Sequence, residues 1–195
     1  NGADDVYLAA PTAGALTEGS AASVTGTLSG TDPAGATLNY SISGSIALDG
    51  SYSATGTYGT LTVNATTGAY EYKLSDTVGS TQLASTDAIV KDAVATETFK
   101  VKVDNGTDRS TKDLTIQITG INDTPVVTAP TTGSLVEGAV ANTVTNTLAA
   151  VDPDTGETAG VTFGITGGAV TTGVSYLTGT YGTLALTVAT GAYTY

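Results

Sequence analysis

The sequence predicts an all-β protein built of tandem β-sandwiches, and three features support this fold class. Thr, Gly, Ala, Val and Ser dominate the 195 residues, with Tyr as nearly the only aromatic residue. This composition favours pleated strands and tight turns over helices. Several segments alternate apolar and polar residues with the period of a strand. The chain also repeats itself after about 120 residues, which is the size of a sandwich domain.

The internal repeat sets the expected domain organisation. Three sequence segments recur in the same order in both halves of the chain. This order predicts a first sandwich repeat with its leading linker in residues 1–121. Residues 122–195 would be the N-terminal part of a second repeat. The boundary is marked by Pro125, which biases the residue before it to an extended backbone. The matching segments are 56–72 with 179–195, 16–19 with 135–138, and 31–33 with 151–153.

The second sandwich is expected to be incomplete. Tyr195 aligns with Tyr72, so the second repeat lacks equivalents of residues 73–120. A half-sandwich exposes strand edges and one apolar face, and such edges recruit further strands. We therefore expect one of two outcomes. Either the natural chain continues beyond Tyr195, or another copy supplies the missing strands and a filament forms by strand complementation.

Alternation within the first repeat predicts which residues are buried. Tyr70, Tyr72 and Leu74 share one face of a strand, opposite two charged residues. Asn105-Gly106 predicts a type I′ turn that joins two antiparallel strands. Residues 80–95 are expected to be weakly helical or irregular. The expected strands are 22–28, 37–43, 59–63, 69–74, 96–103 and 112–119.

Composition also excludes several functions. The chain has no His and no Cys, so the usual general base and thiolate nucleophile are absent and we expect no enzyme. A net charge of −12 and a pI near 4.1 argue against nucleic acid as a partner. No apolar run reaches the roughly 18 residues of a membrane span, so membrane insertion is not expected.

Three sequence blocks resemble the VCBS-type repeats of large secreted bacterial adhesins of the RTX type, which are related in shape to Ig-like and cadherin-like domains. The resemblance implies tandem Greek-key sandwiches at the bacterial cell surface, in a protein that attaches cells to surfaces or to other cells, as in biofilms. It also implies Ca²⁺ near the repeat junctions. The blocks are Gly-x-Tyr-Gly-x-Leu…Gly-x-Tyr-x-Tyr at 56–72 and 179–195, Thr-Phe-x-Val-x-Val-x-x-Gly-Thr at 98–107, and Ile-Thr-Gly-x-Asn-Asp-x-Pro-Val at 118–126.

Acidic residues supply the oxygen donors that such a calcium site needs. By the family pattern, one set would converge at one end of the second sandwich, namely Asn122, Asp123, Glu137, Asp152 and Asp154. The first repeat offers a thinner set of Asp4, Glu18 and Asp32, in which Ala34 stands where the second repeat has Asp154. Asn-Asp and Asp-Pro also suit ordinary turns, and acidity alone keeps a secreted protein in solution.

The partners expected from the sequence are the neighbouring repeats of the same protein and a surface glycan. A carbohydrate-binding or ice-binding module is the alternative function, because exposed Tyr can stack on sugars and rows of Thr can order water. Its sign would be a flat, outward array on strands, and Thr143, Thr145 and Thr147 form the one short run of this type.

Overall fold

The computed structural model describes residues 5–76, 80–140 and 142–195, and it divides the chain into two compact units, Asn1–Asn122 and Asp123–Tyr195. Among the described residues, the helical elements are α1 (Thr81–Thr86) and the short 3-10 turn η1 (Thr158–Gly160), and all other regular structure is strand. The all-β prediction is confirmed. No helix in this part of the chain is long and apolar enough to cross a membrane.

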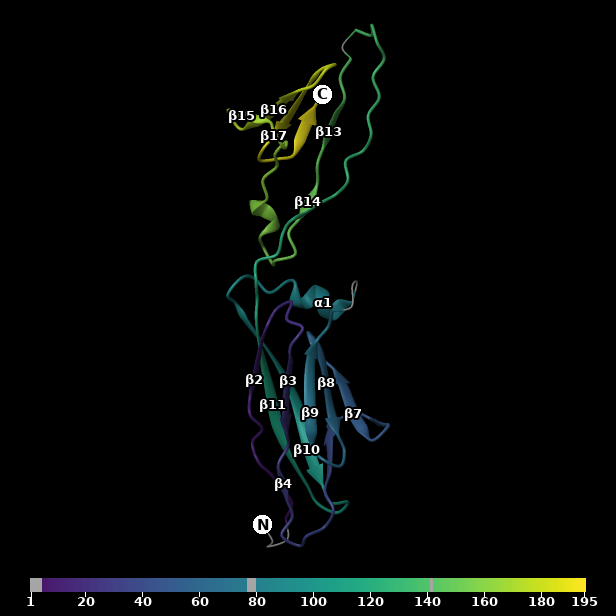
Figure 1. Cartoon of the computed structure of the whole chain (residues 1–195), viewed down its shortest axis with the longest axis vertical. Coiled ribbons are helices and arrows are strands. Elements are labelled where there is room, and N and C mark those ends of the chain that lie inside the picture. The colour runs from purple at the N-terminus through teal and green to yellow at the C-terminus, as the bar shows by residue number, and fades with distance from the viewer. Residues whose placement is uncertain (1–4, 77–79, 141) are drawn as a thin grey trace. The chain divides into compact units, whose positions relative to one another are not determined.

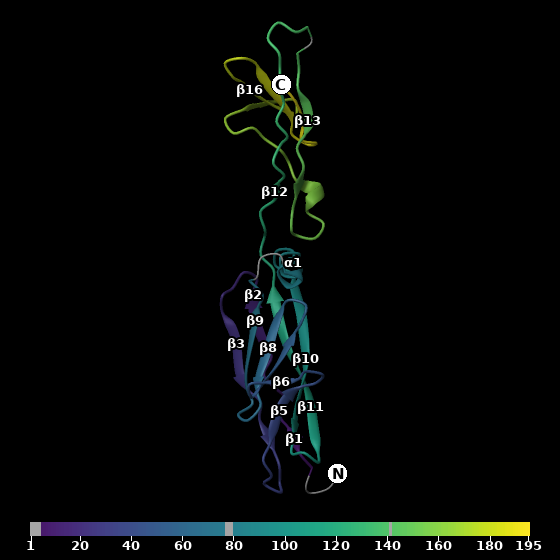
Figure 2. The same cartoon turned by 90° about the vertical axis from the view of Figure 1, so that its right-hand side faces the viewer.

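Unit 1 is a β-sandwich of two main sheets, with strand orders β2-β11-β10-β5 and β3-β9-β8-β7-β6, and a short β1–β4 ladder (Figure 1). In Figure 2, β3, β9 and β8 lie to one side of β10 and β11. The strand bounds are β1 Tyr7–Leu8, β2 Gly14–Thr17, β3 Ser23–Thr27, β4 Gly30–Thr31, β5 Asn39–Ile42, β6 Ala47–Leu48, β7 Ser51–Thr55, β8 Gly59–Asn64, β9 Ala69–Leu74, β10 Val94–Asp104 and β11 Arg109–Thr119.

The core of unit 1 lies between these two sheets. Alternation places every second residue of β10 and β11 inward, and Val101 and Ile116 are fully buried while Lys100 and Gln117 are exposed. From the facing sheet, Tyr72 is also fully buried, as the sequence predicted. The other core residues are Val6, Leu8, Leu16, Leu28, Tyr40, Ile42, Leu61, Val63, Tyr70, Ile89, Phe99, Val103, Leu114 and Ile118.

The hairpin between β10 and β11 pairs antiparallel, which confirms the predicted pairing, but the predicted turn type is wrong. A type I′ turn requires a positive φ at two successive residues. Here the positive φ, 91°, falls on Gly106 and not on Asn105. Asn105 instead accepts hydrogen bonds through its side-chain oxygen from the N–H groups of Thr107 and Asp108, so it shapes the turn as an Asx residue.

The stretch predicted to be helical or irregular contains one short helix. Ser80 is the N-cap of α1, and its hydroxyl accepts a hydrogen bond from Leu83 N–H at 3.1 Å. Six residues are too few for a stable isolated helix, so tertiary packing supports it. Thr86 and Ile89 are buried at this end of unit 1, where α1 lies between β9 and β10 in the chain.

Unit 2 contains a five-stranded sheet of order β13-β18-β17-β16-β15 and a separate β12–β14 ladder. The residues described in this unit form no counterpart of the sheet β2-β11-β10-β5, and Leu186 is their one fully buried hydrophobic residue. The bounds are β12 Val126–Val127, β13 Thr145–Thr147, β14 Ala150–Val151, β15 Ala169–Thr171, β16 Val174–Thr178, β17 Thr183–Thr187 and β18 Ala192–Thr194.

The two units share local structure where their sequences match. Gly68 has a φ of 70° and packs against the Tyr40 ring and the Leu28 carbonyl, which leaves no room for a Cβ. Its counterpart Gly191, with a φ of 71°, packs in the same way against Phe163 and the Leu148 carbonyl. A backbone position with positive φ and a close approach requires glycine in both units.

Truncating the core of unit 1 should destabilise it strongly. Ile116→Ala removes three carbons from a fully buried side chain, and we expect a loss of about 2–5 kcal/mol from the free energy of unfolding of unit 1. Urea unfolding followed by tyrosine fluorescence measures it. The matched control Gln117→Ala lies on the exposed face of the same strand and should change stability by about 0.5 kcal/mol or less. Equal effects of the two variants would contradict the proposed core.

Candidate metal centre

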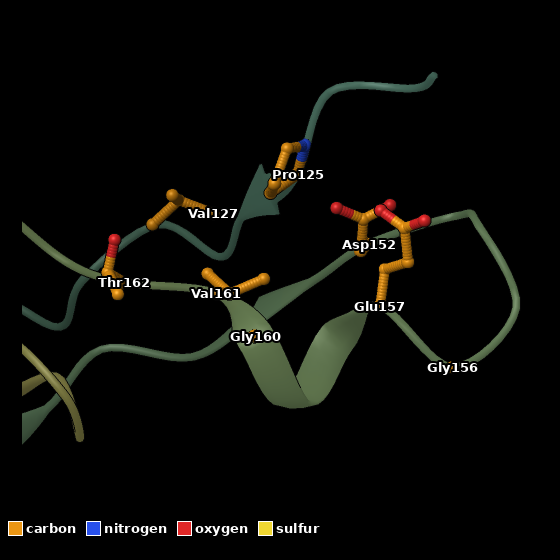
Figure 3. A pocket seen from close by; sticks show the side chains of 8 residues that line it. All are labelled: Pro125, Val127, Asp152, Gly156, Glu157, Gly160, Val161 and Thr162. Atoms are coloured by element: carbon orange, nitrogen blue, oxygen red, sulfur yellow. The ribbon is translucent and has the colours of Figure 1, made fainter. Parts of the chain in front are cut away.

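Three carboxylates meet in unit 2 in the loop that follows β14. One carboxylate oxygen from each of Asp152, Asp154 and Glu157 lies within 4.8 Å of the other two. Figure 3 shows the carboxyl groups of Asp152 and Glu157 turned toward each other beside Pro125. The loop therefore concentrates three negative charges in a volume that one cation could fill.

Backbone and hydroxyl contacts give the loop its shape. Gly156 takes a φ of 88°, and Glu157 N–H donates to the Asp154 carbonyl at 3.2 Å, which closes a turn. The Thr158 hydroxyl accepts a hydrogen bond from Asp152 N–H at 3.0 Å and donates to the Asp152 carbonyl at 3.2 Å. These contacts bring Glu157 back over the two aspartates.

Burial distinguishes Asp154 from an ordinary turn residue. Its side chain is 1% exposed, and that of Asp152 is 8% exposed. Asp154 Oδ2 accepts a hydrogen bond from Asp123 N–H at 2.9 Å, and Asp152 Oδ1 accepts one from Asp154 N–H at 3.1 Å. Asp154 Oδ1 is buried and accepts no hydrogen bond from the part of the chain that the structure describes. A buried, charged oxygen without a donor is costly, and a bound cation would satisfy it.

Beside the three carboxylates lies an open pocket of about 580 Å³. It gives an ion access to solvent, so water can complete a coordination shell that the protein supplies only in part. The pocket is lined by Pro125, Val127, Asp152, Gly156, Glu157, Gly160, Val161 and Thr162 (Figure 3).

The other residues expected at this site lie in different surroundings. Asp123 opens unit 2 and reaches Asp154 through its backbone N–H, as described above. Asn122 is the last residue of unit 1 and is exposed. Glu137 is exposed in the turn that Gly138 closes with a φ of 78°, and it belongs to neither acidic group of the described residues.

Glu18 and Asp32, the described acidic residues of the set expected in the first repeat, are not brought together. Glu18 is buried, accepts Ile121 N–H at 2.8 Å, and has a carboxylate oxygen within 4.8 Å of one of Asp87. Burial raises the pKa of Asp87. Asp32 lies at the other end of β11, where the Asn105 amide donates to it at 2.9 Å. Asp4 lies outside the described residues.

Sequence patterns alone missed two acidic residues in these groups. Glu157 stands three positions after Asp154, and the hydrogen bonds of Thr158 fold it back. An acid that follows Asp-x-Asp-x-Gly was therefore a usable signal. Asp87 falls in the stretch without clear periodicity, just after α1, and no sequence pattern points to it.

The threonine run expected of a glycan-binding or ice-binding surface is short in the structure. Thr145 and Thr147 are exposed on β13, a strand of three residues, and Thr143 precedes it. Strand β13 pairs with β18 alone. It is therefore the edge strand of the five-stranded sheet, and the run covers a single short strand.

Comparisons with known proteins give little guidance. No family model matches the chain, and no curated protein matches it. Among solved structures, the extracellular domain of protocadherin GammaB4 is similar at 17% identity and a TM-score of 0.39 over 98% of this chain. The chain spans 28% of the length of that protein. A similarity at this level carries no argument, so the assignment of unit 1 as a β-sandwich depends on its own sheets.

The contact between Asp32 and Asn105 yields a prediction about pH. The Asn105 amide holds the pKa of Asp32 below its ordinary value, so this contact stabilises the fold above that value and is lost as the pH falls through the lowered pKa. Asn105→Ala should raise the pKa of Asp32 toward its ordinary value, although the Ala34 N–H group still donates to this carboxylate. NMR titration of the Asp32 carboxyl carbon measures the change. Glu71 serves as the control. The Ser23 hydroxyl on the neighbouring strand β3 lowers the pKa of Glu71, and this pKa should stay unchanged. An unchanged pKa of Asp32 would show that the hydrogen bond does not form in solution.

Proposed function

We propose that unit 2 binds Ca²⁺ through Asp152, Asp154 and Glu157, and that the chain is a non-enzymatic, adhesion-type β-sandwich module that the ion makes rigid. The observation that carries this proposal is the buried Asp154 side chain, 1% exposed, with Oδ1 lacking a donor among the described residues. The two neighbouring carboxylates lie within 4.8 Å. Without a cation, these charges repel one another in partly desolvated surroundings.

The donor set selects among cations. Every candidate ligand in the loop is a carboxylate, hydroxyl or carbonyl oxygen, and the chain has no His or Cys to favour zinc or copper. Ca²⁺ accepts six to eight oxygens in a flexible geometry, with water among them, whereas Mg²⁺ requires near-ideal octahedral geometry. A loop that offers three carboxylates next to an open pocket suits the more adaptable ion.

The cellular role that we propose follows from the repeat organisation and the chemistry. A chain of repeated sandwiches with an acidic surface and no catalytic His or Cys is suited to set reach and transmit force. Extracellular fluid supplies millimolar Ca²⁺ for sites of modest affinity. We therefore propose an extender or adhesive module of a bacterial cell-surface protein, of the kind that supports attachment in biofilms, with receptor contact made by other parts of the same assembly.

Calcium should stabilise unit 2 through Asp154. With a dissociation constant of about 0.1 to 1 mM, as in extracellular modules, ~10 mM Ca²⁺ would add roughly 1.4 to 2.7 kcal/mol to its stability. Asp154→Asn should weaken binding at least about tenfold, since one carboxylate is lost. The same change should leave the Ca²⁺-free protein no less stable, because it removes repulsion among three charges. Isothermal titration calorimetry and thermal unfolding measure both effects.

The matched control is Asp108→Asn, which removes one exposed carboxylate from unit 1 and should bind Ca²⁺ as the original chain does. Identical thermal unfolding in Ca²⁺ and in chelator, together with no heat of binding, would overturn the proposal. Equal calcium affinity of the Asp154 and Asp108 variants would overturn the assignment to this loop.

A further inference from the structure

Unit 2 repeats a carboxylate-binding socket of unit 1, together with the sheet face beside it. We propose that unit 2 docks a β-hairpin of the β10–β11 type, with one Glu of that hairpin seated in the socket. The proposal uses none of the residues of the candidate metal centre, so it stands or falls independently of calcium binding.

The socket in unit 1 holds the carboxylate of Glu97. This residue points inward from β10, in the same register as Phe99 and Val101, and is buried. Its Oε1 accepts hydrogen bonds from the backbone N–H groups of Thr57 and Tyr58, and its Oε2 accepts one from the Tyr72 hydroxyl at 2.5 Å. Burial and this hydrogen bond raise the pKa of Tyr72, which keeps the hydroxyl protonated as a donor.

The backbone of the loop at residues 56–59 lies very close to the Glu97 carboxylate and the Tyr72 hydroxyl. A Cβ at Gly56 would collide with the Glu97 carboxylate, and a Cβ at Gly59 would lie 2.8 Å from the Tyr72 hydroxyl. Gly56 N–H donates to the Gly59 carbonyl at 2.8 Å and closes the turn. The socket therefore needs Gly at both ends of the turn and a Tyr on β9.

Unit 2 repeats two contacts of this socket. Gly179 N–H donates to the Gly182 carbonyl at 2.8 Å, and a Cβ at Gly182 would lie 3.0 Å from the Tyr195 hydroxyl. Thr180 and Tyr181 occupy the positions of the two amide donors, and Tyr181 is 94% exposed. Among the described residues, no carboxylate accepts a hydrogen bond from the N–H groups of Thr180 and Tyr181. The donors are thus arranged for a carboxylate that comes from another segment.

The sheet face beside the socket is open and apolar. Leu61 and Tyr72 of unit 1 are fully buried under β10 and β11, whereas their counterparts Leu184 and Tyr195 are half-buried. Two open pockets, of about 440 and 290 Å³, lie on this face. Their apolar lining includes Leu148, Ile165, Leu184 and Leu186 in the first, and Leu135 and Val144 in the second.

Two segments beside this face are positioned to pair with an incoming hairpin. In unit 1, β5 pairs antiparallel with β10, and β2 pairs parallel with β11. Their counterparts, residues 162–165 and 133–136, are not strands in unit 2, and residues 133–136 are exposed. Phe163 N–H nevertheless donates to the Val188 carbonyl at 2.8 Å, as Tyr40 N–H does to Ala65, so one pairing segment is already anchored.

These features define the occupant. It is an antiparallel hairpin whose first strand carries Glu followed by apolar residues at every second position, as Glu97, Phe99, Val101 and Val103 do. Its second strand carries apolar residues at every second position, as Leu114 and Ile116 do. Apolar burial supplies the affinity, and the carboxylate in the socket sets the register, because a slip of one residue would expose the apolar face.

A peptide of residues 94–120 added to the intact chain tests the proposal by NMR. We expect amide protection across residues 133–136 and 162–165, and downfield shifts of the Thr180 and Tyr181 amide protons as they donate to a carboxylate. Glu97→Gln in the peptide should weaken binding by about tenfold or more. Lys100→Gln, which changes the exposed face of the same strand, should leave the affinity within about twofold.

A double-mutant cycle distinguishes binding of the Glu97 carboxylate in the socket from non-specific hydrophobic binding of the peptide. Tyr195→Phe in the protein removes one donor and should weaken the original peptide, but it should weaken the Glu97→Gln peptide much less. Equal binding of both peptides to the original chain would overturn the socket, and no change in unit 2 at any peptide concentration would overturn the docking site. Amide protection in unit 2 that rises with protein concentration and does not depend on the peptide would mean that two unit 2 sheets pack together. That result also overturns the proposal.

Discussion

The packing of the hairpin β10–β11 against the sheet β3-β9-β8-β7-β6 is the interaction on which the rest of unit 1 depends. It buries both inner faces, and it gives β5 and β2 the partners that make them strands. The contact is mostly apolar and therefore not directional, but the hydrogen bonds of Glu97 fix the position of β10 on the facing sheet. Its carboxylate connects β10 to Tyr72 on β9 and to the amides of Thr57 and Tyr58, so the two sheets meet in a single register.

Unit 2 shows what the same sequence pattern does without that facing hairpin. The strands β16, β17 and β18 keep the pairing of β7, β8 and β9, since hairpin formation needs only local residues. The segments that correspond to β2 and β5 stay irregular, because their ladder partners are non-local. The tight contacts of Gly191 with Phe163 and of Gly182 with Tyr195 match those of Gly68 with Tyr40 and of Gly59 with Tyr72 in unit 1. Local chemistry thus survives where the two-layer core does not.

Much of the fold could be predicted from the sequence, because alternation of polar and apolar residues reports directly on which strand face is buried. Tyr70 and Tyr72 illustrate this. The turn type at Asn105 could not be predicted, since an Asn-Gly pair is compatible with several turn types. In the structure the Asn105 side chain accepts backbone N–H groups and gives an Asx turn. Glu97 was missed although its register matches Phe99, because its hydrogen-bond donors lie in a distant loop and on β9, and the sequence does not show that they meet a charged residue in an apolar row.

The candidate site was predictable only in part. Asp152 and Asp154 lie in one short loop, so the sequence itself brings them together. The separation of Glu18 from Asp32 depends on topology: β2 ends where β11 ends, next to Thr119, while Asp32 follows β4 and lies at the hairpin turn of β10 and β11. Burial of Asp154 is likewise a property of the folded loop and cannot be predicted from the sequence composition.

Amide hydrogen exchange across the whole chain is the most direct measurement of this account, because both units carry the same strand pattern and differ in the facing hairpin. The account predicts that amides of β8 and β9 exchange only through global opening of unit 1, whereas the matching amides of β17 and β18 exchange many times faster. Equal protection of the matching strands in the isolated, monomeric chain would contradict it, since unit 2 would then close a core of its own.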